Sequence, residues 1–305
     1  KALSGYIAMA KDLSTYYITT DPETGEQKGM LTLVDGLGFI HHSINHTSTV
    51  TTRFSSSNPN LQNVAGKGKS QIKTVFTSRF AGGTVVQSDF TSLEVYIQAL
   101  LSRCRSLMEA LKAGLDMHVN RVSAKFNVPY EEALVLCKGT KDKPAEPLWK
   151  ERRQGAKEFS FQRAYGAGAE KIAATTGMSV EDVKSLIAME EKLYPEIVRF
   201  NEEVERTVKK NRRPTSRYVQ HPDAPGITLQ LGIGGYRTPD GQLFMFHESP
   251  SPKFMLDRGI VQGFSPPEIK NYPTQGTGST WMKAAMWLAV REFYFYKNWG
   301  GLGLL

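Results

Sequence analysis

The sequence predicts an α+β fold, in which strands near both ends of the chain flank a mostly helical middle. Short β-rich runs bounded by turn residues occur before residue 90 and around residue 240, whereas apolar residues recur at helical spacing through much of 93–210. With 305 residues, 40% of them hydrophobic, the chain can bury a sizeable core as one large domain or two subdomains. We expect strands from the two ends of the chain to pair into one sheet, and the helical residues between them to form a part outside that sheet.

The elements are expected in the following order. A helical start precedes strands at 30–34, 38–42 and 84–88, and the last of these ends at Asp89. Helices are predicted at 93–101, 107–113, 128–136, 179–193 and 196–210. Ser179 is the predicted N-cap of the fourth, because acidic residues follow it in the first turn. Thr-Pro-Asp-Gly within 236–245 predicts a hairpin, and the last helix is expected from about Gly276 to Tyr296.

The charge of the chain indicates the class of partner, and its cysteine content indicates the compartment. The formal charge of +8 and a pI near 9.3 favour an anionic partner without identifying it. Cys104 and Cys137 lie far apart without metal-ligand spacing, so a zinc site or disulfide framework is not expected and a reducing cytoplasm fits. No apolar run approaches the roughly 18 residues of a membrane span, so no membrane partner is expected.

One segment combines cations and aromatic rings on one expected helix face. Arg153, Lys157, Phe161 and Tyr165 stand at four-residue intervals, so on a helix they form a slanted row roughly 18 Å long. The first half of the row is cationic and the second half aromatic. A nucleoside triphosphate has the same polarity, with a phosphate tail and then a sugar and base. The alternative is an ordinary amphipathic helix with solvated cations and core aromatics.

Three further segments carry polar groups that suit nucleic-acid chemistry. Asp89 at an expected strand end could ligand a hard divalent cation, although such a residue also serves as a helix cap or turn former. The segment Thr-Thr-Arg-Phe-Ser-Ser-Ser-Asn-Pro-Asn-Leu-Gln-Asn at 51–63 and Asn-Tyr-Pro-Thr-Gln at 271–275 hold Arg, Asn and Gln. These side chains can reach phosphates and minor-groove acceptors, but each segment alone is a polar loop of weak specificity.

Taken in order, these segments resemble the polymerase domain of family A DNA polymerases, the bacterial polymerase I and phage replicase group. Residues 51–63 resemble T-G-R-x-S-S-x-x-P-N-L-Q-N, and SDFTSLEVYIQALLS resembles motif A, D-Y-S-Q-I-E-L-R. The run Leu-Asp-Met-His at 115–118 resembles the D-I-H element, and RRQGAKEFSFQRAYGAG fits motif B, R-x3-K-x3-[FY]-x3-Y-G. The tail YGAGAEKI is phage-like, and NYPTQGTGS is similar to N-x-P-x-Q-G-T-A.

The resemblance implies a role for each matching position. Asp89, with the carbonyl of Phe90, would bind two magnesium ions, and Glu94 would reject a 2′-hydroxyl below the sugar. The motif B row would hold the nucleotide, with the triphosphate on Arg153 and Lys157, the sugar on Phe161 and the base on Tyr165. The residues expected to contact primer–template DNA are Arg53, Asn60, Gln62, Asn63, Asn271 and Gln275.

The resemblance also implies domains, partners and a location. Residues 1–110 would form the N-terminal part of the palm, 111–262 the fingers and 263–305 a palm return segment, with the thumb largely absent. The partners would be primer–template DNA and dNTPs, together with replisome proteins such as a processivity factor, in the bacterial cytoplasm or in that of a phage host. The rival from another class is a non-catalytic nucleic-acid-binding protein derived from a polymerase. A single-subunit RNA polymerase fits less well, because Glu94 would serve no purpose there.

Several positions depart from the family pattern. Phe90 replaces a tyrosine, Thr52 replaces the glycine before Arg53, and Pro267 stands where an arginine is usual. Gln162 and Arg163 add polarity to motif B. Motif C, V-H-D-E, does not occur in the 305 residues. We expect it beyond Leu305, and we therefore expect this piece of chain to be inactive or nearly so by itself.

Overall fold

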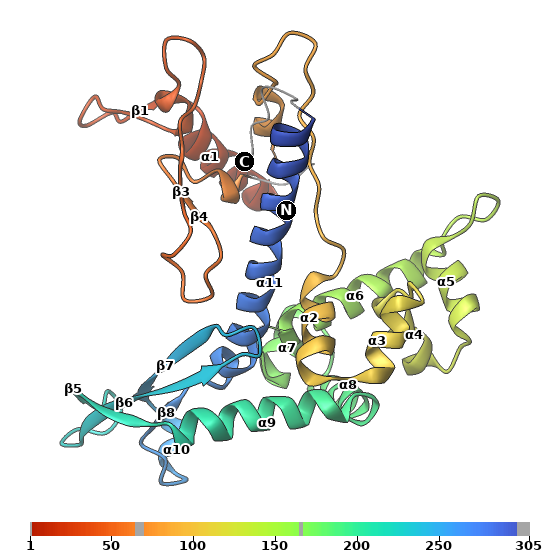
Figure 1. Cartoon of the computed structure of the whole chain (residues 1–305), viewed down its shortest axis with the longest axis vertical. Coiled ribbons are helices and arrows are strands. Elements are labelled where there is room, and N and C mark those ends of the chain that lie inside the picture. The colour runs from red at the N-terminus through yellow and green to blue at the C-terminus, as the bar shows by residue number, and fades with distance from the viewer. Residues whose placement is uncertain (1, 65–69, 165–166, 298–305) are drawn as a thin grey trace. The chain divides into compact units, whose positions relative to one another are not determined.

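The computed structural model describes residues 2–64, 70–164 and 167–297, which form two compact units (Figure 1). One unit comprises the described residues of 1–90 and 279–305, and the other comprises those of 91–278. Helices and antiparallel strands occur together, which confirms the predicted α+β class. No helix among the described residues is long and apolar enough to cross a membrane.

The unit of residues 91–278 is built mainly from helices. Its helices are α2 (Leu93–Ser102), α3 (Arg105–Lys112), α4 (Met117–Phe126), α5 (Tyr130–Lys138), α6 (Pro147–Ala164), α7 (Ala169–Thr176), α8 (Val180–Leu193), α9 (Pro195–Lys210) and the short α10 (Lys253–Leu256). The first part of α11 (Pro266–Val290) also belongs here. The helices predicted at 93–101, 107–113, 128–136, 179–193 and 196–210 are all confirmed, with ends shifted by a few residues.

Local signals explain where these helices begin. The Ser179 side chain accepts a hydrogen bond from the Asp182 N–H at 3.0 Å, which confirms the predicted N-cap of α8. The Asp116 carboxylate caps α4 in the same way, because it accepts the N–H groups of His118 and Val119, each at 3.0 Å. Pro195 occupies the first turn of α9, where its missing N–H has no helical partner to lose.

A four-stranded antiparallel sheet packs against α9 in the same unit, as the green helix beside the blue strands shows (Figure 1). Its order is β5 (Arg213–Gln220), β6 (Thr228–Arg237), β7 (Leu243–Pro250) and β8 (Gln262–Phe264). Arg237 pairs with Leu243, so the turn between β6 and β7 contains Thr-Pro-Asp-Gly and the predicted hairpin is confirmed. The core cluster here combines side chains of α9, of β7 and of α11, namely Phe200, Val204, Val208, Phe244, Phe246 and Ile269.

An ion pair to a buried carboxylate lies where α9 leads into this sheet. Arg212 donates two hydrogen bonds to the Glu248 carboxylate, at 2.7 and 2.8 Å, and Glu248 is 7% exposed. The Gly232 N–H at 2.6 Å and the Gln262 amide at 2.9 Å donate to the same carboxylate. Burial alone would raise the pKa of Glu248, but the hydrogen bond from Arg212 and the others lower it. The charge is therefore compensated from the two neighbouring strands, β6 and β8, and from the turn that follows α9.

The unit of residues 1–90 and 279–305 contains smaller elements. They are α1 (Ala2–Tyr16), the strand pair β1 (Thr19–Thr20) and β2 (Gln27–Lys28), the pair β3 (Ser43–Asn45) and β4 (Ser55–Ser57), three 3₁₀ turns (Met30–Leu33, Leu61–Asn63, Ile72–Val75), the rest of α11 and a π-helical turn (Arg291–Tyr296). The predicted helical start is confirmed by α1.

Five expectations about strands and helix ends were wrong. Residues 30–34 and 38–42 form a 3₁₀ turn and a single bridge between Val34 and Ile40. Residues 84–88 are extended without strand pairing; Val86 is 84% exposed, and β propensity forms no strand without a partner and a buried face. The described residues of the two ends share no sheet, because the C-terminal ones are helical. The last helix begins at Pro266 rather than Gly276, since prolines are tolerated in a first turn.

Candidate functional site

Helix α6 carries the cationic half of the predicted row on a different side from its buried residues. Arg153 is half-buried and Lys157 is exposed, four residues apart on the helix. Phe159 is fully buried with Ile172, Val183 and Leu186 of the neighbouring helices. The Phe161 side chain and all of Tyr165 lie outside the described residues. The described part of the row therefore presents two cations on a helix whose other face is anchored in the core.

Asp116 is the direct partner of Arg153. The Asp116 Oδ2 atom accepts hydrogen bonds from Arg153 Nη2 at 2.6 Å and Nε at 3.2 Å, and it also forms an ion pair with Lys138 Nζ at 2.7 Å. The other oxygen caps α4, as described above. Burial would raise the pKa of Asp116, but the hydrogen bonds from Arg153 and Lys138 outweigh it and hold the pKa well below its usual value. Asp116 thus fixes one end of Arg153 as a carboxylate.

His118 lies in the first turn of α4 and is uncharged near neutral pH. Burial, followed by the nearby Arg121, lowers the pKa of His118 to about 4. Its Nδ1 atom is 3.1 Å from the Ser160 hydroxyl on α6. The Ser160 hydroxyl also donates to the carbonyl of Ala156 at 2.6 Å. The first turn of α4 therefore contacts α6 at two levels, through Asp116 at Arg153 and through His118 at Ser160.

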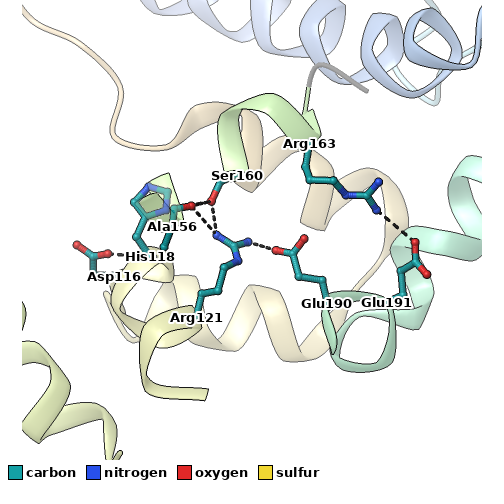
Figure 2. A network of polar contacts seen from close by, with 8 residues as sticks. All are labelled: Asp116, His118, Arg121, Ala156, Ser160, Arg163, Glu190 and Glu191. Carbon is teal, nitrogen blue, oxygen red and sulfur yellow. Dashed lines mark hydrogen bonds and ion pairs between the residues drawn. The ribbon is translucent and has the colours of Figure 1, made fainter. Parts of the chain in front are cut away.

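Two ion pairs tie this region to α8, as Figure 2 shows. Arg121 of α4 donates to the Ser160 hydroxyl and, at 3.3 Å, to the carbonyl of Ala156, and its other terminal nitrogen pairs with Glu190. Burial lowers the pKa of the Arg121 guanidinium to about 10, so it stays charged at neutral pH. Arg163 of α6 donates to the next carboxylate, Glu191, at 3.2 Å. The polarity that Arg163 adds to motif B therefore serves packing against α8.

The segment that resembles the primer–template element is held by its own polar groups. The Asn60 side chain accepts the Gln62 N–H at 3.1 Å and caps the 3₁₀ turn Leu61–Asn63. The Asn63 carbonyl accepts the Tyr16 hydroxyl of α1 at 3.0 Å. Arg53, half-buried, immediately precedes Phe54 and β4. The structure thus orders Arg53, Asn60, Gln62 and Asn63 within one unit.

Asn271 and Gln275, one helical turn apart, both lie on α11. Asn271 is half-buried and Gln275 is 7% exposed. Gly276 follows at a close approach between helix and sheet, because an added Cβ would overlap the ring of Phe244 on β7. The Gln275 side chain is therefore buried, next to a glycine that packs on β7.

The predicted metal ligands lie in one unit, and Glu94, the residue expected below the sugar, lies in the other. Asp89 and Phe90 are exposed and belong to the first unit, whereas Glu94 is half-buried in the first turn of α2. Within the described ranges, no group of three or more His, Cys, Asp or Glu side chains is placed to hold a metal ion. Asp89 offers a hard oxygen ligand of the kind that magnesium prefers. The described residues alone therefore do not complete a metal site.

Three residues that sequence reasoning did not single out contact the site. Asp116 was noted only as part of a motif, and its partners Arg153 and Lys138 could not be read from the pattern. Its position before Met-His-Val is a typical N-cap signal, which would have placed it at the start of α4. The pairing of Arg121 with Glu190 could not be predicted from a local pattern, because the two residues are 69 positions apart in sequence.

Comparisons with known proteins agree on one family. Residues 6–297 match the model of DNA polymerase family A. Over 199 residues the chain is 28% identical to DNA polymerase I of Treponema pallidum, a match that covers 63% of this chain and 18% of the relative. It is 30% identical over 186 residues to DNA polymerase I of Helicobacter pylori, covering 59% and 19% of the two chains. It is 28% identical over 178 residues to the thermostable DNA polymerase I of Thermus aquaticus, covering 58% and 19%.

A solved structure supports the fold. The POL domain of Pol1 from M. smegmatis, in complex with DNA primer-template and dNTP, aligns with a TM-score of 0.54 and 22% identity. The alignment covers 86% of this chain and 40% of that chain. At this identity the likeness shows a shared fold. The chain spans less than a fifth of the length of the curated relatives named above.

Proposed function

The chain belongs to DNA polymerase family A, and from this premise we propose that its protein catalyses template-directed DNA synthesis. The reaction transfers a nucleotidyl group from a dNTP to a primer 3′-hydroxyl and releases pyrophosphate. The observation that carries the proposal is the pair Arg153 and Lys157 on α6, a helix anchored by Phe159 on another side. Phosphoryl transfer depends on positioning and electrostatic stabilisation rather than on covalent chemistry by the protein, and two cations on an anchored helix supply both.

The proposed nucleotide contacts follow the polarity of α6. Arg153 and Lys157 bind the triphosphate, Phe161 packs on the sugar and Tyr165 packs on the base side of the nascent pair. Lys157 is exposed, so it can meet an incoming phosphate directly. Arg153 is held at its Nε and Nη2 atoms by Asp116, which leaves Nη1 as the donor that a phosphate can reach without displacing the carboxylate.

We further propose the ligands for metal, sugar and DNA. The Asp89 carboxylate and the Phe90 carbonyl would hold magnesium, which when bound neutralises charge that develops on the transferred phosphate. Glu94 would stand below the sugar and exclude a 2′-hydroxyl. The residues proposed to contact primer–template DNA are Arg53, Asn60, Gln62, Asn63, Asn271 and Gln275. The net charge of +8 suits this polyanionic partner.

The biological setting is also a proposal. The YGAGAEKI run of motif B favours a phage replicase, which would act in the cytoplasm of its host. Primer–template DNA and dNTPs are the partners, and any processivity factor would bind outside the nucleotide site. We keep the prediction that residues 1–305 alone extend primers poorly, since they contain no V-H-D-E motif.

Primer extension tests the proposal. The protein encoded by the complete reading frame is incubated with a labelled primer–template, dNTPs and Mg²⁺, and so is its Asp89→Asn variant. Asp240→Asn, at the exposed hairpin tip between β6 and β7, is the matched control. We expect extension by the wild type and the control and nearly none by Asp89→Asn. DNA binding without extension by the wild type would favour the non-catalytic alternative, and equal extension by all three would remove Asp89 from the mechanism.

A further inference from the structure

The backbone of the Arg53 segment adopts a costly conformation at the residue before Arg53. Thr52 has a φ of +56°, in the left-handed region that favours glycine. A β-branched residue is among the least suited to this region, because its Cβ substituents crowd the backbone. The Thr52 hydroxyl is also buried, with no hydrogen-bond partner among the described residues. The conformation therefore persists only because neighbouring groups impose it.

Ser279 of α11 is the nearest of these groups. Its hydroxyl donates to the carbonyl of Thr52 at 2.7 Å, and Ser279 is 4% exposed. On the other side, the Thr52 N–H donates to the carbonyl of Thr49 at 3.0 Å, and the Thr49 hydroxyl donates to the carbonyl of Arg53 at 2.8 Å. The peptide groups on both sides of Arg53 are thus held by hydrogen bonds, of which the one from Ser279 comes from outside the turn.

A second anchor follows one helical turn later on α11. The Lys283 ammonium donates to the carbonyl of His46 at 3.0 Å and lies 5.1 Å from the centre of the Phe54 ring. Ser279 and Lys283 are four residues apart, so they lie on the same face of the helix. Ser279 and Lys283 together hold residues 46–54, on both sides of Arg53, against the helix α11.

We propose that Ser279 is a positioning residue for primer–template binding, supported by Lys283. It holds the left-handed turn at Thr52 and thereby fixes the backbone from which Arg53 reaches the DNA. This inference rests on the DNA-contact role of Arg53 proposed above. Fixing the turn before the DNA arrives reduces the conformational entropy lost on binding, so the expected effect is on affinity. Both anchors and the Arg53 segment lie in the same unit of the chain.

The test is the dissociation constant of a fluorescent primer–template hairpin, measured by anisotropy with this chain at fixed salt. Ser279→Ala should weaken binding about five- to tenfold, the loss that corresponds to one net hydrogen bond. Ser279→Thr keeps the hydroxyl and should restore most of the affinity. Thr52→Gly in the Ser279→Ala background should also restore the affinity, because glycine adopts the left-handed turn without the hydrogen bond from Ser279. Ser102→Ala removes a hydroxyl bonded only within α2 and is the matched control.

A double-mutant cycle separates positioning from general stability. In the Arg53→Ala background, Ser279→Ala should have little further effect on DNA affinity, because Arg53 is the group being positioned. If the wild-type chain binds no primer–template, the proposed function fails. The inference about Ser279 fails if the wild type binds and Ser279→Ala binds equally well. It also fails if Ser279→Ala weakens binding by the same factor in the Arg53→Ala background as in the wild type. If Ser279→Ala does not fold, the Thr52→Gly and Ser279→Ala double variant decides, since it must bind like the wild type.

Discussion

Replacing Asp116 by asparagine tests how α4 holds α6. The change removes the charge that pairs with Arg153 and Lys138, but asparagine is as good an N-cap as aspartate, so the start of α4 is retained. The Arg153 side chain is 28% exposed, and a hydrogen bond to a charged group of this kind contributes about 1.5–3 kcal/mol. The Lys138 side chain is 46% exposed, so its ion pair adds at most about 1 kcal/mol. We expect Asp116→Asn to lower the free energy of unfolding by about 2–3 kcal/mol.

The assay is urea unfolding of the chain followed by circular dichroism, with hydrogen exchange to locate the loss in α4 and α6. Asp142→Asn, at an exposed loop position, is the control and should change stability little. Because the pKa of Asp116 is held below its ordinary value of 3.8, its contribution is fully present above that pH and is lost as the pH falls through the folded-state pKa. The difference from wild type should thus stay constant between about pH 5 and 8 and shrink in stronger acid. A difference below about 0.5 kcal/mol at pH 7 would refute the reasoning.

Three further outcomes are expected. Arg121→Met should destabilise the chain by about 3–5 kcal/mol in urea unfolding, because it leaves Glu190 uncompensated. The added change Glu190→Leu should recover much of the loss, and equal losses in the single and the double variant would argue against a buried pair. Gly276→Ala should cost about 1–3 kcal/mol in the same measurement, because its Cβ would overlap Phe244, and a neutral effect would contradict that packing. Glu94→Ala in the complete protein should raise incorporation of ribonucleotides in primer extension, and unchanged discrimination would remove Glu94 from sugar selection.

Local signals predicted the helices and the hairpin but not the pairing of distant groups. The cap at Ser179 and the turn Thr-Pro-Asp-Gly act within a few residues, so the sequence shows them directly. The contact between Arg153 and Asp116 joins residues 37 positions apart, and many acidic residues could have been its partner. Residues 84–88 had the composition of a strand, but a strand also needs a neighbour, which composition cannot supply.

The residues of the candidate site that belong to the ordered motifs could be predicted from the sequence. The four-residue spacing placed Arg153 and Lys157 on one helix, and α6 confirms that helix. The buried state of Gln275 was not foreseen, because the segment 271–275 alone was interpreted as a polar loop, whereas it lies within α11. The left-handed backbone at Thr52 was also missed, although the glycine of the family at that position was the available signal.

The central claim is that α6 holds the triphosphate, and the affinity of a fluorescent dNTP for this chain tests it most directly. Lys157 and Lys171 are both exposed and line the same shallow depression between α6 and α7, but only Lys157 belongs to the row. Lys157→Ala should weaken binding about tenfold or more, through loss of one charge-assisted contact, whereas Lys171→Ala should change it less than about twofold. Equal losses in the two variants, or wild-type affinity in Lys157→Ala, would contradict the account.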